Sequence, residues 1–166
     1  MSDIKIGVLS DTHLARPDDT FRQQVKACFA KVSIIIHAGD LTDVSILEVF
    51  ADKEIHAVHG NMCEASAYKA LPGRKIIEVG PYRIAITHGA GVGSNIEETL
   101  YDYFFPIDCI IYGHTHQPVC HQTGRVLFMN PGSFTRTSRY GAPGTYGILE
   151  VGDKLSGAIY EIPRAQ

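Results

Sequence analysis

The sequence predicts an α/β fold in which two β-sheets face each other and helices cover the outside. The first 60 residues alternate strand-like apolar runs with helical patterns, an order that favours a parallel sheet with crossover helices. The later part of the chain consists mainly of strand pairs joined by short turns that contain glycine. A length of 166 residues fits one domain with a sizeable core. We therefore expect residues 1–166 to form a single domain.

Three strands and two helices are expected in the first 60 residues. The strands are rich in isoleucine and valine and end at turn residues, which is typical of buried strands. Aspartates precede both helical patterns and can cap them, because a carboxylate accepts hydrogen bonds from the first free backbone N–H groups. The predicted strands are 3–9, 33–37 and 54–59, and the predicted helices run from Asp18 or Asp19 to about Lys31 and from Val44 to about Ala51.

The remaining elements are mostly strands. Hairpins are expected where two apolar runs flank a turn such as Gly80-Pro81, Thr123-Gly124 or Gly152-Asp153. One helical pattern follows a glycine-rich loop, with two glutamates in its first turn. The predicted strands are 75–79, 82–87, 108–112, 119–121, 125–129, 146–151 and 154–160, and the predicted helix is 94–105.

Composition places the chain among ordinary globular proteins. A net charge of −3 gives no basic footprint for nucleic acid. The N-terminal residues lack the pattern of a signal peptide, and no apolar run approaches the ~20 residues needed to span a bilayer. We therefore expect a cytoplasmic protein with no membrane partner. Its four cysteines form no C-x-x-C pair, which favours free thiols over disulfides or a cysteine zinc site.

Metal-binding side chains follow five of the predicted strands. Any one of them alone would be an ordinary turn or loop residue. Ligands bind outside the carboxyl ends of strands in open α/β sheets, so five such ends at one sheet edge indicate a metal site. Residues i and i+2 of a strand point the same way, so we expect the histidines of the Gly113-His-Thr-His116 segment to face one point. The candidate ligands are Asp11, His13, Asp40, Asn61, His88, His114 and His116.

The chemistry of these donors indicates the metal. All are nitrogen or oxygen donors without a thiolate, a set that favours Mn²⁺, Fe, Zn²⁺ or Ni²⁺ over a metal that prefers sulfur. Of these we take Mn²⁺ as the first candidate. Seven side chains exceed the needs of one tetrahedral ion. They suit two divalent ions that share a carboxylate at the ~3.5–4 Å separation found in two-metal hydrolases.

The five motifs occur in the order D-T-H, G-D, G-N, H-G and G-H-T-H, and in this arrangement the chain resembles the calcineurin-like metallophosphoesterase superfamily. Its length, the Asn130-Pro-Gly-Ser133 segment and the strand-rich tail resemble the small YfcE-type phosphodiesterase branch. The resemblance implies a four-layer αββα sandwich with a dinuclear site. It implies that one ion takes Asp11, His13 and His116, and that the other takes Asn61, His88 and His114. Asp40 would bridge them.

The same resemblance implies the activity, a metal-dependent phosphodiesterase acting on a small phosphodiester. A hydroxide bridging the two ions would attack phosphorus. Asp40, Asn61, His88 and His114 are the implied catalytic residues.

The chain departs from the superfamily pattern after Asn61. Many members carry a histidine there that can protonate the leaving group, whereas this chain has Met62. His59 or His37 at a strand end could replace it, although a packed or solvated histidine is the simpler interpretation of each. Ser133 and Arg136 are candidate substrate contacts, since an arginine can hold a phosphate through two hydrogen bonds. A solvated loop arginine is the alternative.

Two other functions use the same fold. A phosphomonoesterase would share the site and differ only in its pocket. The eukaryotic retromer subunit Vps29 resembles this branch and acts as a protein-interaction scaffold with a compromised metal site. The complete set of seven donors in this chain favours catalysis. Aromatic residues of the 94–105 helix suggest core packing or a homodimer surface.

Overall fold

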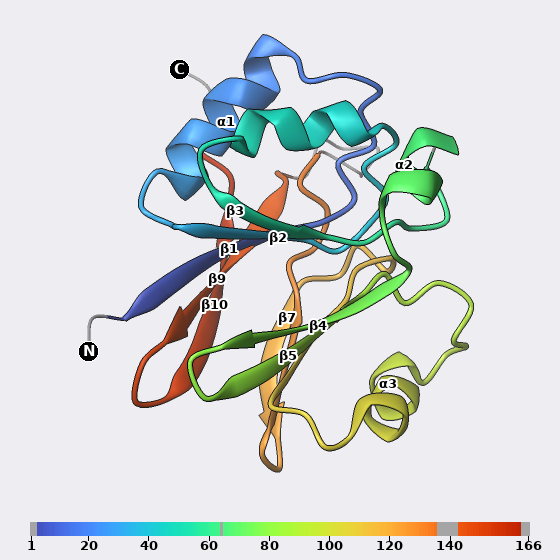
Figure 1. The fold of residues 1–166 in the computed structure, drawn as a ribbon, viewed down its shortest axis with the longest axis vertical. Helices are drawn as coiled ribbons and strands as arrows, with labels where there is room; N and C mark the ends of the chain where they lie inside the picture. The colour runs from blue at the N-terminus through green and yellow to red at the C-terminus, as the bar shows by residue number, and fades with distance from the viewer. Residues whose placement is uncertain (1–2, 64, 136–142, 164–166) are drawn as a thin grey trace.

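The computed structural model describes residues 3–63, 65–135 and 143–163. In this part of the chain, two five-stranded mixed sheets lie face to face and helices cover their outer surfaces (Figure 1). This arrangement confirms the predicted fold class. It also confirms the four-layer order of helices, sheet, sheet and helix.

The first sheet contains the three parallel strands that the alternating pattern predicted. β1, β2 and β3 are parallel neighbours, and the β9–β10 hairpin pairs antiparallel with the free edge of β1. This hairpin comes from the other end of the sequence, so the chain closes the sheet by a long-range pairing. The strand order is β10 (Leu155–Glu161), β9 (Thr145–Val151), β1 (Ile4–Leu9), β2 (Ile34–His37) and β3 (Glu54–Ala57).

The second sheet combines two hairpins with a central parallel core. β5, β6 and β8 are parallel, while β4 and β7 lie antiparallel at the two edges. Its strand order is β4 (Arg74–Val79), β5 (Tyr82–Thr87), β6 (Cys109–Ile111), β8 (Val126–Asn130) and β7 (Val119–Thr123).

Helices flank both sheets. Asp18 caps α1 (Asp19–Phe29) through a 2.7 Å hydrogen bond from the backbone N–H of Phe21, as the sequence predicted. The second predicted helix is a 3₁₀ helix, η1 (Val44–Phe50), capped by Asp43. The third is α3 (Ile96–Phe104). The short α2 (Ala65–Ala70) was not predicted.

Three apolar layers hold the four structural layers together. Between the sheets, Ile6 and Val8 of β1 pack in one cluster with residues of β5, β6 and β8. Outside the first sheet, α1 buries the predicted stripe of Phe21, Val25, Cys28 and Phe29. Outside the second sheet, α3 buries Leu100 and Phe104. Burial of this kind is the main stabilising term in folding.

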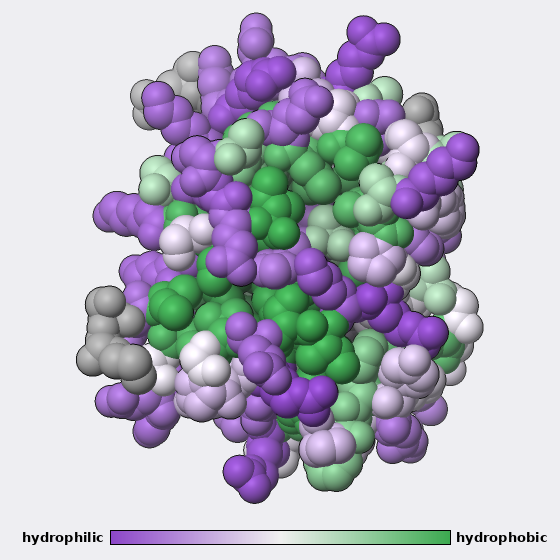
Figure 2. Space-filling model, in the orientation of Figure 1, coloured by the Kyte–Doolittle hydropathy of each residue, from purple (hydrophilic) through white to green (hydrophobic). Residues whose placement is uncertain are grey.

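The surface carries some exposed apolar residues. Figure 2 shows hydrophobic side chains gathered across the middle of one face, with hydrophilic side chains around them. On α3 and just after it, Tyr103 and Phe105 are 58% and 59% exposed. No helix in the described ranges is long and apolar enough to cross a bilayer. All four cysteines are free thiols, as expected.

Candidate metal centre

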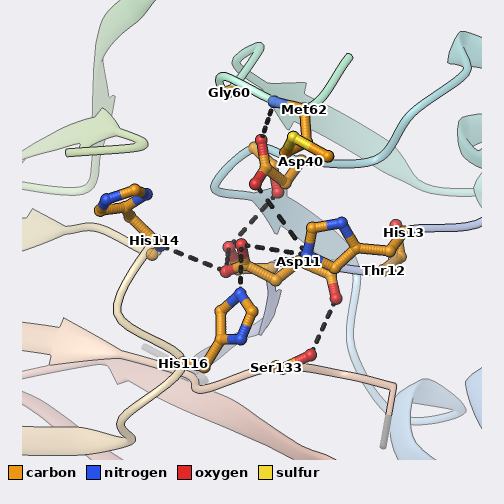
Figure 3. A network of polar contacts seen from close by, with 12 residues as sticks. Asp11, Thr12, His13, Asp40, Gly60, Met62, His114, His116 and Ser133 are labelled. Carbon is orange, nitrogen blue, oxygen red and sulfur yellow. Dashed lines mark hydrogen bonds and ion pairs between the residues drawn. The ribbon is translucent and has the colours of Figure 1, made fainter. Parts of the chain in front are cut away.

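The loops after β1, β2, β5 and β6 meet at one edge of the sandwich. Backbone hydrogen bonds tie them together: Asp11 N–H donates to the Gly39 carbonyl at 2.9 Å, and His13 N–H donates to the Asp40 carbonyl at 3.1 Å. Within the second sheet, Gly113 N–H donates to the His88 carbonyl at 3.1 Å, and His88 Nδ1 lies 2.8 Å from the Ala38 carbonyl in the loop after β2 of the first sheet. The predicted ligands of both sheets are thereby brought to one place (Figure 3).

Ligand residues in these loops adopt an unusual backbone conformation. Positive φ values of 49–70° occur in three pairs of residues two positions apart, and none of the six is a glycine. The left-handed region costs a non-glycine residue roughly 1–2 kcal/mol, although Asp and His tolerate it better than most. Such strain clusters at functional sites, where it holds side chains in place. The pairs are Asp11 and His13, Asp40 and Thr42, and His114 and His116.

The side chains form two overlapping groups whose ligand atoms lie within 4.8 Å of one another. One group contains Asp11, His13 and His116, and the other contains Asp11, Asp40 and His88. Asp11 is common to both, whereas the resemblance assigned the shared position to Asp40. Asp40 is a member of the second group only, but it also lies close to the first. Its Oδ2 is 3.2 Å from His88 Nε2 of its own group and 3.9 Å from His13 Nε2 of the other. Two cations bound here would therefore have both carboxylates, Asp11 and Asp40, within reach.

The two histidines of the H-T-H segment lie beside different residues of the site. The His116 ring lies against His13, with centroids 5.4 Å apart, and His116 Nε2 is 3.3 Å from Asp11 Oδ1. The His114 ring instead lies against His88, with centroids 5.3 Å apart, and its backbone N–H donates to Asp11 Oδ2 at 3.2 Å. The left-handed backbone explains why the rings do not face one point. His116 thus lies beside His13 and His114 beside His88, but His114 belongs to neither of the two groups of ligand atoms, and its role as a ligand stays a prediction.

Asn61 lies next to His88 and Asp40. One end of its side-chain amide lies 3.0 Å from His88 Nε2 and 3.2 Å and 3.3 Å from the carboxylate oxygens of Asp40. A nitrogen at that end would donate to these groups. An oxygen there would face three acceptors, an arrangement that a cation between them satisfies.

A surrounding layer of hydrogen bonds orients the ligands. His88 Nδ1 lies 2.8 Å from the Ala38 carbonyl and donates to it, which leaves Nε2 free to face the centre. Ser10 Oγ donates to Asp11 Oδ2 at 2.6 Å, and the backbone N–H of Met62 donates to Asp40 Oδ1 at 2.7 Å. Sequence reasoning missed Ser10 and the fully buried Thr12, although these hydroxyl residues directly flank Asp11 in the sequence.

Two glycines are required by close packing against the ligands. A Cβ atom on Gly60 would lie 2.1 Å from Asp40 Oδ1, and one on Gly113 would lie 2.9 Å from Asp11 Oδ2. Both glycines let the backbone approach a carboxylate more closely than any other residue allows.

The charge balance of the site calls for a cation. Asp11 is fully buried and Asp40 is 2% exposed, and in the described ranges no lysine or arginine forms an ion pair with either. Burying two carboxylates without enough positive charge nearby is costly. The buried atoms Asp11 Oδ1 and His13 Nε2 also lack hydrogen-bond partners within the described residues. The donor set therefore fits divalent metal ions.

The neighbouring side chains shift one another's pKa values. Burial favours the neutral form of Asp11, but His13, Ser10 and the charges of His88 and His116 outweigh it and lower its pKa. The carboxylate of Asp11 raises the pKa of His13 against the effect of burial. Burial also opposes charge on His88, yet Asp40 and Asp11 raise its pKa. The Asp11 carboxylate is thus held in the ionised form that binds metal.

Other predicted residues lie in different surroundings. Ser133 is buried, and its hydroxyl lies 2.9 Å from the backbone carbonyls of both Asp11 and Thr135. It supports the ligand loop, and its contact with substrate stays a prediction. Arg136 lies outside the described residues. His59 packs against Tyr68 with ring centroids 4.5 Å apart, and His37 is fully buried.

Sequence comparisons point to one family. The profile of the calcineurin-like phosphoesterase superfamily domain matches residues 4–154. A probable metallophosphoesterase of Methanocaldococcus jannaschii is 37% identical over 134 residues, which are 78% of this chain and 68% of that protein. A phosphodiesterase of the same archaeon is 30% identical over 146 residues, covering 78% of this chain and 83% of that protein.

A structural comparison gives the same fold. Vacuolar protein sorting 29 from Cryptosporidium parvum superimposes with a TM-score of 0.73 over 98% of this chain and 99% of that one. The sequence identity is 17%, so this likeness concerns the fold alone.

Proposed function

Because the chain belongs to the calcineurin-like phosphoesterase superfamily, we propose that it is a metal-dependent phosphodiesterase acting on a small phosphodiester. The observation that carries the proposal is the pair of buried carboxylates, Asp11 and Asp40, which are surrounded by imidazole nitrogens and have no lysine or arginine partner in the described residues. Two divalent ions would complete this site, with Mn²⁺ as the first candidate.

The side chains of the proposed site differ in how far they are exposed to solvent. Two bound divalent ions would lower the pKa of a water molecule and supply hydroxide at neutral pH. Of the four residues expected to act in catalysis, Asp40 and His88 are buried, His114 is half-buried and Asn61 is exposed. The side chains of His13 and His116 are 30% and 35% exposed, against 4% for His88. We expect the phosphodiester to approach from the solvent-facing side of the site, where Asn61, His13 and His116 are accessible.

Among the described residues, neither the position after Asn61 nor His37 or His59 offers a free imidazole that could protonate the leaving group. Met62 follows Asn61; the residue is 58% exposed, and its backbone N–H donates to Asp40. Both ring nitrogens of His37 contact other groups inside the protein, and the His59 ring packs on Tyr68. An ester whose leaving group is already a stable anion needs no such acid, which favours aryl diesters among test substrates.

A metal-by-substrate screen tests the proposal. Protein stripped of metal and reloaded with Mn²⁺, Fe²⁺, Zn²⁺ or Ni²⁺ would be assayed with bis(p-nitrophenyl) phosphate and p-nitrophenyl phosphate. We expect diester hydrolysis that depends on the metal. Faster monoester hydrolysis would indicate a phosphomonoesterase. Metal binding without hydrolysis of either ester would favour an interaction scaffold of the Vps29 kind.

Asp40→Asn should separate catalysis from folding. The neutral amide weakens the contacts with both cations, so we expect activity to fall by about a hundredfold or more while the circular dichroism spectrum is unchanged. His121→Ala is the control. His121 forms an exposed ion pair with Glu97, and such pairs contribute little to stability. Similar losses in both variants would contradict the assignment of Asp40.

A further inference from the structure

His37 is a buried histidine that the proposed mechanism does not use. It is the last residue of β2 and is fully inaccessible to solvent. Burial lowers its pKa to about 4, so its ring is neutral at physiological pH. It belongs to neither group of metal ligands. A neutral buried imidazole still has one donor and one acceptor to satisfy.

Both ring nitrogens of His37 bind the loops that carry metal ligands. The backbone N–H of Gly39 donates to Nδ1 at 3.1 Å, so the proton of the neutral ring is on Nε2. Nε2 lies 3.2 Å from Thr12 Oγ1 and donates to it. The ring therefore connects the loop after β1 with the loop after β2.

The two connected loops hold strained ligand residues. Thr12 lies between Asp11 and His13, and Gly39 precedes Asp40, and all three ligands have φ values of 49–58°. Residues in this region persist only where surrounding contacts fix them. Backbone hydrogen bonds already hold the two loops together. The His37 ring adds a side-chain connection between them, through Thr12 and Gly39.

We propose that His37 is a positioning residue whose imidazole, through Gly39 and Thr12, sets the spacing between the Asp11–His13 loop and Asp40. This inference rests on the proposed metal centre. It predicts that His37 and Thr12 affect metal affinity through the same hydrogen bond. His37 binds Thr12 and Gly39, which are neighbours of metal ligands in the sequence and not ligands themselves. Residues that orient metal ligands typically contribute about 10- to 100-fold to affinity.

Manganese binding to four variants tests this inference. His37→Leu, Thr12→Val, the double variant and Thr12→Ser would be titrated with Mn²⁺ by calorimetry, and bound Mn²⁺ would be followed by electron paramagnetic resonance. We expect about tenfold weaker binding in His37→Leu and in Thr12→Val. The double variant should be no worse than the weaker single variant, because both remove the same link. Thr12→Ser, which keeps the hydroxyl, should bind like the wild type.

Controls separate this role from general destabilisation. His56→Leu, on the neighbouring strand β3, removes a histidine bonded to Glu54 and should leave Mn²⁺ affinity unchanged. If His37→Leu does not fold, Thr12→Val and Thr12→Ser decide the question. Folded variants with wild-type affinity, or strictly additive losses, would overturn the inference. A wild-type protein that binds no metal would overturn the proposed function instead.

Discussion

Gly60 shows at the scale of one residue how tightly the ligand loops are packed. A Cβ atom there would lie 2.1 Å from Asp40 Oδ1 and 2.6 Å from the Asp40 backbone nitrogen. Because a backbone atom cannot move aside easily, we expect Gly60→Ala to displace the Asp40 carboxylate. Mn²⁺ affinity, measured by calorimetry, should fall by about tenfold or more.

Gly73→Ala provides the matched comparison. The nearest atom to a new Cβ at that position is His59 Nε2 at 3.3 Å, the end of a side chain. Affinity should therefore stay close to that of the wild type. Equal effects of the two substitutions would show that Gly60 is not required by its contact with Asp40.

We expect the residue at position 62 to determine how the rate depends on the leaving group. Positioned acid catalysis typically contributes ~10²–10⁴-fold, and without it an ester depends on the stability of the departing anion. We expect aryl diesters to react far faster than alkyl diesters, with a steep dependence of kcat/KM on leaving-group pKa. Met62→His should flatten that dependence across a series of substituted phenyl esters. A flat dependence in the wild type would mean that another acid is present, with His59 the first to replace.

At the scale of elements, local patterns predicted most strands. β1, β2, β5 and β6 are short β-branched runs that end at a turn, and their structural bounds lie within one or two residues of the predicted ones. The five ligand-bearing strand ends could be recognised because each metal-binding residue directly follows such a run. The pairing of β9 with β1 could not be predicted, because it joins residues about 140 apart in the sequence.

The left-handed backbone of the ligand loops could not be recognised from turn residues such as glycine in the sequence. Asp11, His13 and His116 adopt positive φ without being glycine, so the sequence indicated extended or ordinary turn geometry. Tertiary contacts impose this conformation and decide that His114 and His116 turn toward different partners. The helix after Asp43 was predicted, but its 3₁₀ form depends on packing that the apolar pattern does not reveal.

The link between the β1 and β2 loops should make stability depend on pH. His37 is neutral when folded, with a pKa of about 4 against an ordinary value of 6.5, so the unfolded chain binds an extra proton between these values. Stability from this group is complete above pH 6.5 and is lost as pH falls toward 4, by up to about 1.4 kcal/mol per pH unit. Urea unfolding in EDTA should show the decline in the wild type.

His37→Gln isolates this contribution. Its amide has no proton to gain, so the difference in unfolding free energy between wild type and variant should shrink as pH falls from 7 to 4.5. A difference that does not change with pH would mean that His37 titrates normally in the folded protein.

At the scale of the whole molecule, the candidate metal centre joins the two sheets. Asp11, His13, Asp40 and Asn61 follow strands of the first sheet, whereas His88, His114 and His116 follow strands of the second. Ions bound between them would connect the layers at one end of the sandwich, in addition to the apolar layer between the sheets. The unfolded chain does not preserve this arrangement. Metal binding should therefore stabilise the entire fold.

Two ions per chain and a matching gain in stability are the expected results of Mn²⁺ loading. Elemental analysis of the loaded protein should give about two Mn²⁺ per chain, following the two-metal pattern. One ion at a hundred times its Kd stabilises the folded state by ~2.7 kcal/mol, which for a chain of this size raises Tm by about 5–10 °C. EDTA should reverse the shift, and Asp40→Asn should reduce it, because Asp40 borders both groups of ligands. Saturation at one ion at every Mn²⁺ concentration, with the full Tm shift already reached, would contradict the dinuclear centre and leave a single-metal site around Asp11.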